Sequence, residues 1–271
     1  MSKIATLFGI IFGLVMIGST TYDFQSNQLI SAFFNLQALL LVLGGTFAAI
    51  LVNYSFEQIG CAYKGFVKVL TTEPARPDLI VEELVEFSHL SKHKGLLELE
   101  KHVDRVQTPF LKYSIGEMLL YKDRQELEKK LQSQLIYMRL RHQTCQEVYE
   151  NMATYAPAFG MMGTVMGLII MMTSQLGGSD ASAYAANSAD SLSGLLVGMG
   201  LALVTTFYGV LFANLFFLPI AGKLKILSDA EVVQNEMVIE AIMAMKDAES
   251  SLMVRERLLA YLDQKALNAL S

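Results

Sequence analysis

Long charge-free stretches alternate with polar segments along this chain. Four stretches contain no Asp, Glu, Lys or Arg, namely residues 4–22, 24–56, 151–179 and 191–222. A helix that crosses a bilayer needs about 20 mostly apolar residues, so each stretch is long enough for one crossing. We therefore expect four transmembrane helices, of which the longer ones tilt or extend past the bilayer.

The polar segments have the apolar spacing of amphipathic helices. Pro77 is typical of a helix start, and Gly95 is expected to end that helix. A second helix begins near residue 123, and no breaker precedes Pro157, which predicts one rod that enters the third span and kinks near the proline. Two faces are expected to be buried in the polar segments: Ile80, Leu84 and Phe87, and then Leu127, Leu131, Leu135 and Met138.

Charge distribution orients the spans. All 21 basic residues lie at Lys3, within residues 54–154, or after residue 221, whereas residues 21–29 and 177–190 contain none. The positive-inside rule then places both termini and the central segment in the cytoplasm. Lys3 and the apolar run after it could also mimic a signal peptide, but no convincing cleavage site follows.

These patterns predict an all-α membrane protein. Residues 1–53 supply spans one and two, 54–154 a helical cytoplasmic domain, 155–222 spans three and four, and 223–271 a helical cytoplasmic tail with helices at 232–245 and 252–262. No strand-like alternation is present. Cys61 and Cys145 fall on the cytoplasmic side, where disulfides are rare, so we expect free thiols.

Composition agrees with a membrane protein. The chain is 53% hydrophobic and only 17% charged, which is too apolar for an ordinary soluble domain. Its net charge of −5 gives no case for binding nucleic acid.

The third span carries a stripe of small and hydroxyl-bearing residues. At 100° per residue, one face collects Pro157, Gly160, Gly163, Thr164, Gly167 and Ser174. The fourth span has a matching face with Gly194, Gly198, Ala202, Thr205, Gly209 and Ala213, and Thr206 at its edge. Lipid gains nothing from such faces, so they press against other helices or line a path.

Two interpretations of the stripes remain open. Small residues often serve close helix packing alone, and threonines often donate to carbonyls of their own helix. Pro157 favours an ion path, because it removes a backbone donor and leaves a carbonyl free near the hydroxyls. The spans contain no Asp, Glu, Lys, Arg or His, so if the chain serves ion flow, the titrating carboxylate at membrane depth must come from a partner subunit.

Several segments resemble the MotA/PomA family, the A subunits of flagellar motor stators. Residues 156–168 (APAFGMMGTVMGL) resemble the family's third span, and 203–209 (LVTTFYG), Asn214 and 217–221 (FLPIA) its fourth. The run KHKGLLELE at 92–100 is similar to its rotor-facing motif. The resemblance covers nearly the whole chain.

The resemblance implies a non-enzymatic rotary machine for bacterial motility and chemotaxis in the inner membrane, without a cofactor or permanent metal. A homopentamer of A subunits surrounds two single-span B subunits, whose intramembrane Asp carries the ion. Pro157 and Gly160 then lie on the ion path beside that aspartate, and Pro219 matches a second functional proline.

Thr164, Thr205 and Thr206 match positions typical of sodium-driven members, so the resemblance favours transient Na⁺ binding near them, with H⁺ as the other possible ion. The implied rotor contacts, to a ring protein of the switch complex, are Lys92, His93, Lys94 and Glu100. Here the motif departs from the family, which has a basic residue at the position of His93. Rotor contact is then expected to use Lys92 and Lys94, and the alternative interpretation is that these charges form only a solvated helix face.

Two further departures indicate a divergent member: the outer loop 177–190 is long, and residues 248–253 lack an Asn-Pro turn. The main alternative is a proton-channel energiser of envelope transport of the ExbB/TolQ type, which shares the third-span motif but typically has three spans. A membrane scaffold without ion flux is a third hypothesis.

Overall fold

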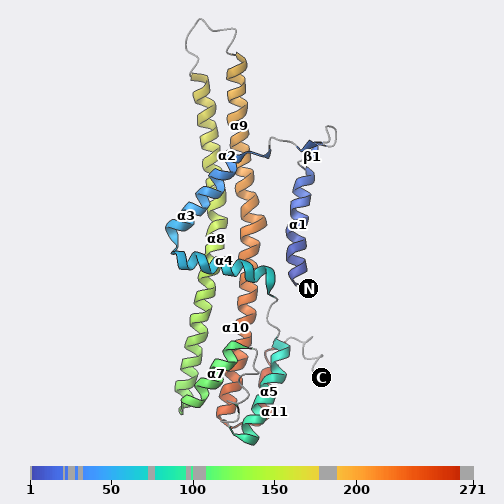
Figure 1. The fold of residues 1–271 in the computed structure, drawn as a ribbon, viewed down its shortest axis with the longest axis vertical. Helices are drawn as coiled ribbons and strands as arrows, with labels where there is room; N and C mark the ends of the chain where they lie inside the picture. Colours follow the sequence, from blue (N-terminus) through green and yellow to red (C-terminus); the bar gives the residue numbers. More distant parts are fainter. Residues whose placement is uncertain are drawn as a thin grey trace. The chain divides into compact units, whose positions relative to one another are not determined.

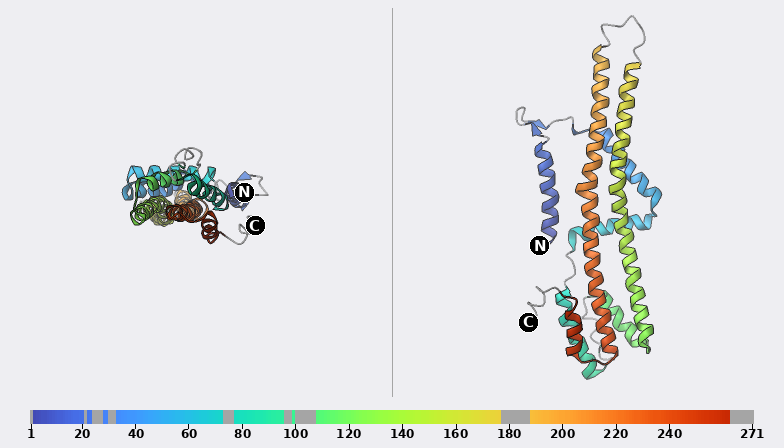
Figure 2. Two further views of the ribbon diagram at one scale, coloured as in Figure 1. Left: turned by 90° about the horizontal axis from the view of Figure 1, so that it is seen from below. Right: turned by 180° about the vertical axis from the view of Figure 1, so that it is seen from behind.

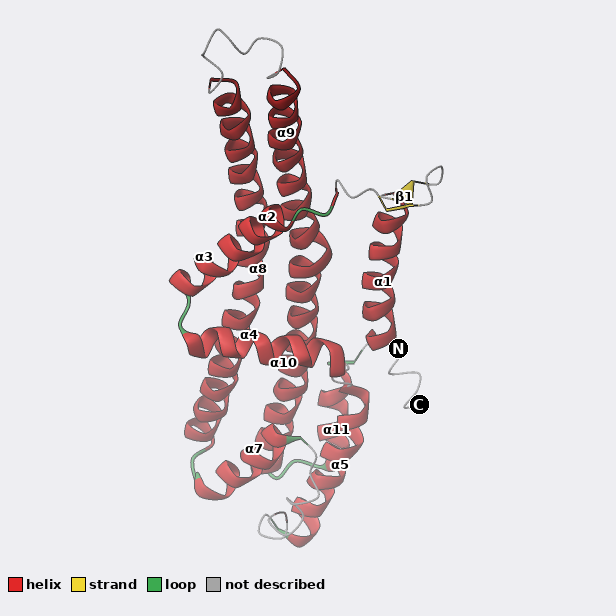
Figure 3. Cartoon of the chain, turned by 45° about the horizontal axis from the view of Figure 1, so that its top comes forward, coloured by secondary structure: helices red, strands yellow, loops and turns green. Residues whose placement is uncertain are grey.

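The computed structural model describes residues 2–20, 22–23, 28–29, 33–72, 77–95, 99, 108–176 and 188–262. Almost all of this part of the chain is helical (Figures 1 and 3). One short antiparallel pair joins β1 (Tyr22–Asp23) to β2 (Gln28–Leu29). Strands of two residues are too short to leave an alternation pattern in the sequence.

The chain divides into two compact units. The first comprises Met1–Thr72 with Thr144–Leu224, and the second Glu73–Gln143 with Lys225–Ser271. The two long helices α8 (Arg124–Leu176) and α10 (Leu218–Lys246) each contribute to both units.

The first unit holds the charge-free stretches. Among the described residues, three helices are long and apolar enough to cross a membrane: Leu36–Asn53, Arg124–Thr173 and Leu195–Lys246. The first predicted span forms helix α1 (Ser2–Thr20). The other elements are α2 (Leu36–Leu39), η2 (Leu40–Gly44), α3 (Gly45–Asn53), α4 (Phe56–Thr71), α9 (Ser188–Leu211) and η4 (Phe212–Phe217).

Both long helices continue past the points where the sequence changes between charged and charge-free residues. Helix α8 continues through Pro157, as the lack of breakers predicts. The expected tail helix at 232–245 is not separate, because α10 runs from Leu218 to Lys246 without a break. Lysines are good helix formers, so Lys223 and Lys225 end the apolar stretch but not the helix.

Two π-helical turns interrupt spans two and four. Segment η2 leads directly into Gly45, and η4 ends two residues before Pro219. Proline cannot donate to the carbonyl four residues earlier, and π turns are one way in which a helix accommodates such a missing bond. The hydropathy pattern does not reveal these turns.

The second unit is a helical domain around one apolar core. It contains α5 (Pro77–Lys94), α7 (Pro109–Leu120) and α11 (Ser251–Leu259), and α11 packs along α5 (Figure 3). Both predicted faces are buried in this core, from Ile80 to Phe87 and from Leu127 to Met138. Its fully buried side chains include Leu84, Leu111, Ile115, Leu127, Leu131, Met237, Ile242 and Leu258.

Candidate functional site

The small-residue faces of spans three and four lie against each other within this chain. Helices α8 and α9 run side by side in the first unit (Figure 2). A Cβ added at Gly160 would lie 2.9 Å from the carbonyl oxygen of Thr205, and one added at Gly167 would lie 2.5 Å from that of Gly198. These separations are too short for any side chain, so glycine sets how closely the helices approach.

Pro157 lies at one end of this close contact. Its ring is half-buried, and a Cβ added at Gly209 would lie 3.0 Å from its Cα and 2.7 Å from the carbonyl oxygen of Ala156. Because proline lacks an N–H, the carbonyl of Ala153 loses its usual helical donor. The structure therefore brings a proline with a released carbonyl against a glycine of the neighbouring span.

The threonines differ in accessibility. Thr205 is fully buried against α8, and its hydroxyl donates to the carbonyls of Leu201 and Ala202, each at 3.0 Å. Thr206 and Thr164 are half-buried and also donate to carbonyls of their own helices. A donating hydroxyl keeps lone pairs that can accept or coordinate.

The predicted ion-path residues are only partly brought together. Gly160 meets Thr205 and the Cα of Thr206, whereas Thr164 lies along the same face of α8. Pro219 is exposed at the second position of α10 and lies beyond the glycine contacts. Among the described residues, no group of three or more His, Cys, Asp or Glu side chains can hold a metal ion.

A polar layer at the C-terminal end of α3 was missed by sequence reasoning. The Asn151 amide donates to the Tyr54 hydroxyl, and the Asn53 amide donates to the Tyr155 hydroxyl at 3.4 Å. Phe159 packs directly on Gly45. The signal was two Asn-Tyr pairs near the ends of charge-free stretches, where side chains with polar tips are favoured. This layer fixes the end of span two on α8.

The expected rotor-facing charges belong to the second unit. Lys92 and His93 are exposed near the end of α5, where the imidazole rings of His93 and His89 lie with centres 4.2 Å apart and planes tilted by 42°. Lys94 is the last residue of the helix, and Glu100 lies outside the described residues.

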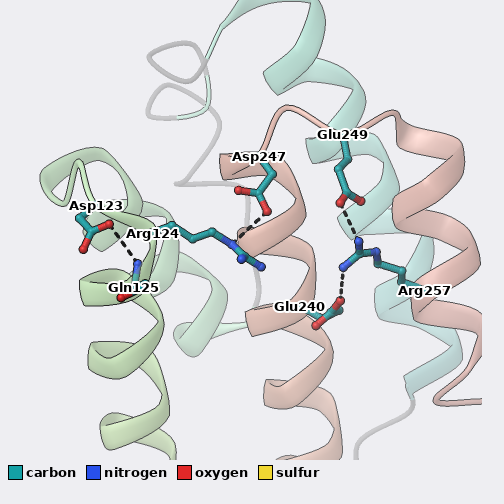
Figure 4. A network of polar contacts seen from close by, with 7 residues as sticks. All are labelled: Asp123, Arg124, Gln125, Glu240, Asp247, Glu249 and Arg257. Carbon is teal, nitrogen blue, oxygen red and sulfur yellow. Dashed lines mark hydrogen bonds and ion pairs between the residues drawn. The ribbon is translucent and has the colours of Figure 1, made fainter.

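An ion-pair network joins helices of this second unit (Figure 4). The Arg257 guanidinium donates to Glu240 at 2.8 Å and to Glu249 at 2.6 Å, which holds α11 on α10. Arg124, at the start of α8, pairs with Asp247 at 2.9 Å. Since α11 packs along α5, this network supports the helix that carries Lys92.

The fold and the close helix pair define a multi-span helical membrane protein. The model of the MotA/TolQ/ExbB proton channel family matches residues 102–237, which is 136 of the 271 residues. The chain therefore belongs to the MotA/TolQ/ExbB proton channel family.

Known relatives match almost from end to end. Motility protein A of Treponema pallidum (strain Nichols) is 30% identical over 96% of this chain and 92% of its own length. Motility protein A of Cereibacter sphaeroides is 29% identical, with 97% and 96% covered. The solved structure of C. jejuni MotAB shares the fold, with a TM-score of 0.81, 20% identity and 96% of both chains covered. The resemblance to the MotA/PomA family and the all-helical fold class are confirmed.

Proposed function

We propose that this chain is the A subunit of a bacterial flagellar motor stator, an ion-driven torque generator of the inner membrane. The observation that carries this proposal is the agreement, over nearly its whole length, with proteins named motility protein A. In this proposal the chain has four spans and both termini in the cytoplasm, in line with its basic residues.

The helix pair suits one wall of an ion path. Spans three and four carry a proline, hydroxyls and released carbonyl oxygen but no carboxylate. A single-span B subunit would supply the intramembrane Asp, and five copies of this chain would surround two such subunits. Pro157 would lie beside that aspartate.

Sodium is the proposed ion. A proton needs only the carboxylate, whereas Na⁺ needs several oxygen ligands. The hydroxyls of Thr164 and Thr206 keep accessible surface and lone pairs that could bind the ion. Thr205 is covered by α8 in the single chain, so its role would be to pack span four against span three.

Torque would pass to a ring protein of the rotor switch complex through the end of α5. Lys92 and His93 are exposed there, and Lys94 and Glu100 complete the motif. The Arg257 network, which holds α11 on α10 beside α5, would help this surface to bear load.

A complementation experiment tests the proposal. A strain that lacks its A subunit receives this chain with its cognate B subunit, and swimming is scored. Pro157→Ala should stop swimming while the complex still assembles, whereas Pro109→Ala, at the start of α7, should swim normally. Swimming by the Pro157→Ala variant would contradict the role of the proline, and a periplasmic N-terminus would favour the energiser alternative.

A further inference from the structure

The two cysteines of the chain are joined, contrary to the expected free thiols. Cys61 of α4 and Cys145 of α8, 84 residues apart in the chain, form a disulfide with Cα atoms 5.8 Å apart. The expectation of free thiols rested only on the predicted cytoplasmic location of the two cysteines. That location does not say which helices pack together. The disulfide fastens α4, the helix that follows span two, to α8.

Packing places the sulfur atoms together independently of the bond. The Tyr149 hydroxyl, one turn after Cys145, donates to the carbonyl of Ala62 at 3.0 Å, and both residues are buried. Farther along α4, a Cβ added at Gly65 would lie 3.2 Å from the Leu224 side chain. These noncovalent contacts bring α4 close to α8, so the cysteines can join without a large rearrangement, whereas without the bond the two helices keep the freedom to shift that packing contacts allow.

The surroundings of the two sulfur atoms differ. Cys61 is half-buried, whereas Cys145 is only 6% exposed. A small oxidant therefore reaches Cys61 first, and the sheltered Cys145 is positioned to resolve the oxidised sulfur. This is the usual division between an accessible and a resolving cysteine.

Whether Cys61 and Cys145 are reduced or joined in the cell depends on the redox state of the compartment that contains them. Lys64 and Lys68 lie on α4, and the charge rule places this helix on the cytoplasmic side, where thiols are kept reduced. We propose that Cys61 and Cys145 form a reversible redox site that is open in the resting cell and closed by cytoplasmic peroxide, with the closed form restraining α4 on α8 and slowing the motor. The motor readout of this inference rests on the proposed function, whereas the thiol chemistry does not.

The chemistry balances with hydrogen peroxide as the oxidant. The Cys61 thiolate attacks one peroxide oxygen, the O–O bond breaks, and sulfenic acid forms while the hydroxide that leaves takes up the proton released by the thiol and becomes one water. The Cys145 thiolate then attacks the Cys61 sulfur and displaces hydroxide, which takes up the proton released by Cys145 and becomes a second water. In sum, two thiols and one peroxide give one disulfide and two waters, and a cytoplasmic dithiol reverses the step by exchange.

The restraint bears on the part of α8 that precedes Pro157. The proline lies about three turns beyond Cys145, and a helix that lacks a backbone bond bends more easily there. Helix α4 also rests on α10 through Gly65, so the disulfide ties α8 to a second element of the same unit. Bending of α8 during ion passage is thereby limited.

The test uses the full stator in swimming cells. Thiols are counted by mass-tag alkylation before and after a peroxide pulse, and speed is recorded in parallel for the wild type, Cys61→Ser/Cys145→Ser and Tyr149→Phe. We expect two free thiols at rest, joint loss of both tags after the pulse and recovery on washing, with a speed loss of twofold or more. The double variant should keep its speed, and Tyr149→Phe, which retains the thiols, should still respond.

Each other outcome counts against the inference. A disulfide that is present at rest and does not respond to peroxide would show that the bond is structural. Thiols that never form the disulfide would show that the two cysteines are not a redox site. Equal slowing of the wild type and the double variant would show that the disulfide does not cause the loss of speed. If the chain supports no swimming at all, the proposed function fails, but the thiol count still reports on the redox site.

Discussion

At the scale of residues, glycines of α8 and α9 decide how closely the two spans approach. The sequence was sufficient to predict both small-residue faces, because helical spacing alone groups them. It could not show that the faces meet each other within one chain. Nor could it separate Gly198, which touches backbone of α8, from Gly200, which has open space around it.

This difference gives a matched pair of substitutions in one helix. Gly198→Ala places a methyl 2.7 Å from the Gly167 carbonyl oxygen, whereas Gly200→Ala meets nothing within 4 Å. Forcing extra carbon into a packed contact costs about 1–3 kcal/mol, so Gly198→Ala should lower the melting temperature of the purified complex and slow swimming. Gly200→Ala should leave both unchanged, and equal effects would argue against the close contact.

The half-buried carboxyl of Glu83 gives a pH-dependent prediction. Burial, and next the nearby Glu86 carboxylate, raise the pKa of Glu83 above its ordinary value. The folded state then holds this proton more tightly than the unfolded state, so stability is lost as the pH rises through the titration of Glu83. Glu83→Gln should raise the melting temperature at neutral pH, and the gain should vanish as the pH falls toward about 4.3.

The neighbouring glutamate is the control. Glu82 is exposed, so Glu82→Gln should leave the melting temperature at neutral pH close to that of the wild type. A gain for Glu83→Gln that stays constant from acidic to neutral pH would show that the charge of Glu83 is not its cause.

At the scale of elements, helix ends were predictable where a residue enforces them. Pro77 begins α5, and Gly95 ends it with a φ of +85° while its N–H donates to the Ser91 carbonyl at 3.0 Å. Ends inferred from charge alone were wrong, as in α10, because a change from apolar to charged residues does not stop a helix. The π turns left no signal in hydropathy because they alter hydrogen bonding and not composition.

The end of α5 can be tested directly. A Cβ is disfavoured at positive φ, so Gly95→Ala should cost about 1 kcal/mol of unfolding free energy. Gly95→Asn should cost less. In contrast, Gly116→Ala lies inside α7 with open space around it and should stabilise by up to about 1 kcal/mol. Thermal unfolding of the purified variants measures the order, and a destabilised Gly116→Ala would contradict it.

At the scale of the whole molecule, the most informative feature for the proposed function is that the predicted spans contain no Asp or Glu. The sequence predicts this absence reliably, because a count of charged residues needs no structure. Arrangement around a partner is a property of the assembly, so neither the ion nor the stoichiometry follows from one chain. In the proposed function, the wall of the ion path is incomplete until a second protein supplies the acid.

The proposed sodium dependence is a prediction at this scale. Swimming speed should follow external sodium at constant pH, and Thr206→Ala should raise the sodium needed for half-maximal speed several-fold, because one ligand oxygen is lost. Thr173→Ala, on the opposite face of α8 from Thr164, should leave the sodium response unchanged. Speed that tracks proton-motive force and ignores sodium would contradict the assignment.

The composition of the complex tests the central claim most directly. Native mass spectrometry of the complex, extracted from its own membranes, counts this chain and every protein bound to it. We predict five copies of this chain with two copies of a single-span protein that carries an intramembrane Asp. A stable complex of this chain with no acid-bearing single-span partner would contradict the account.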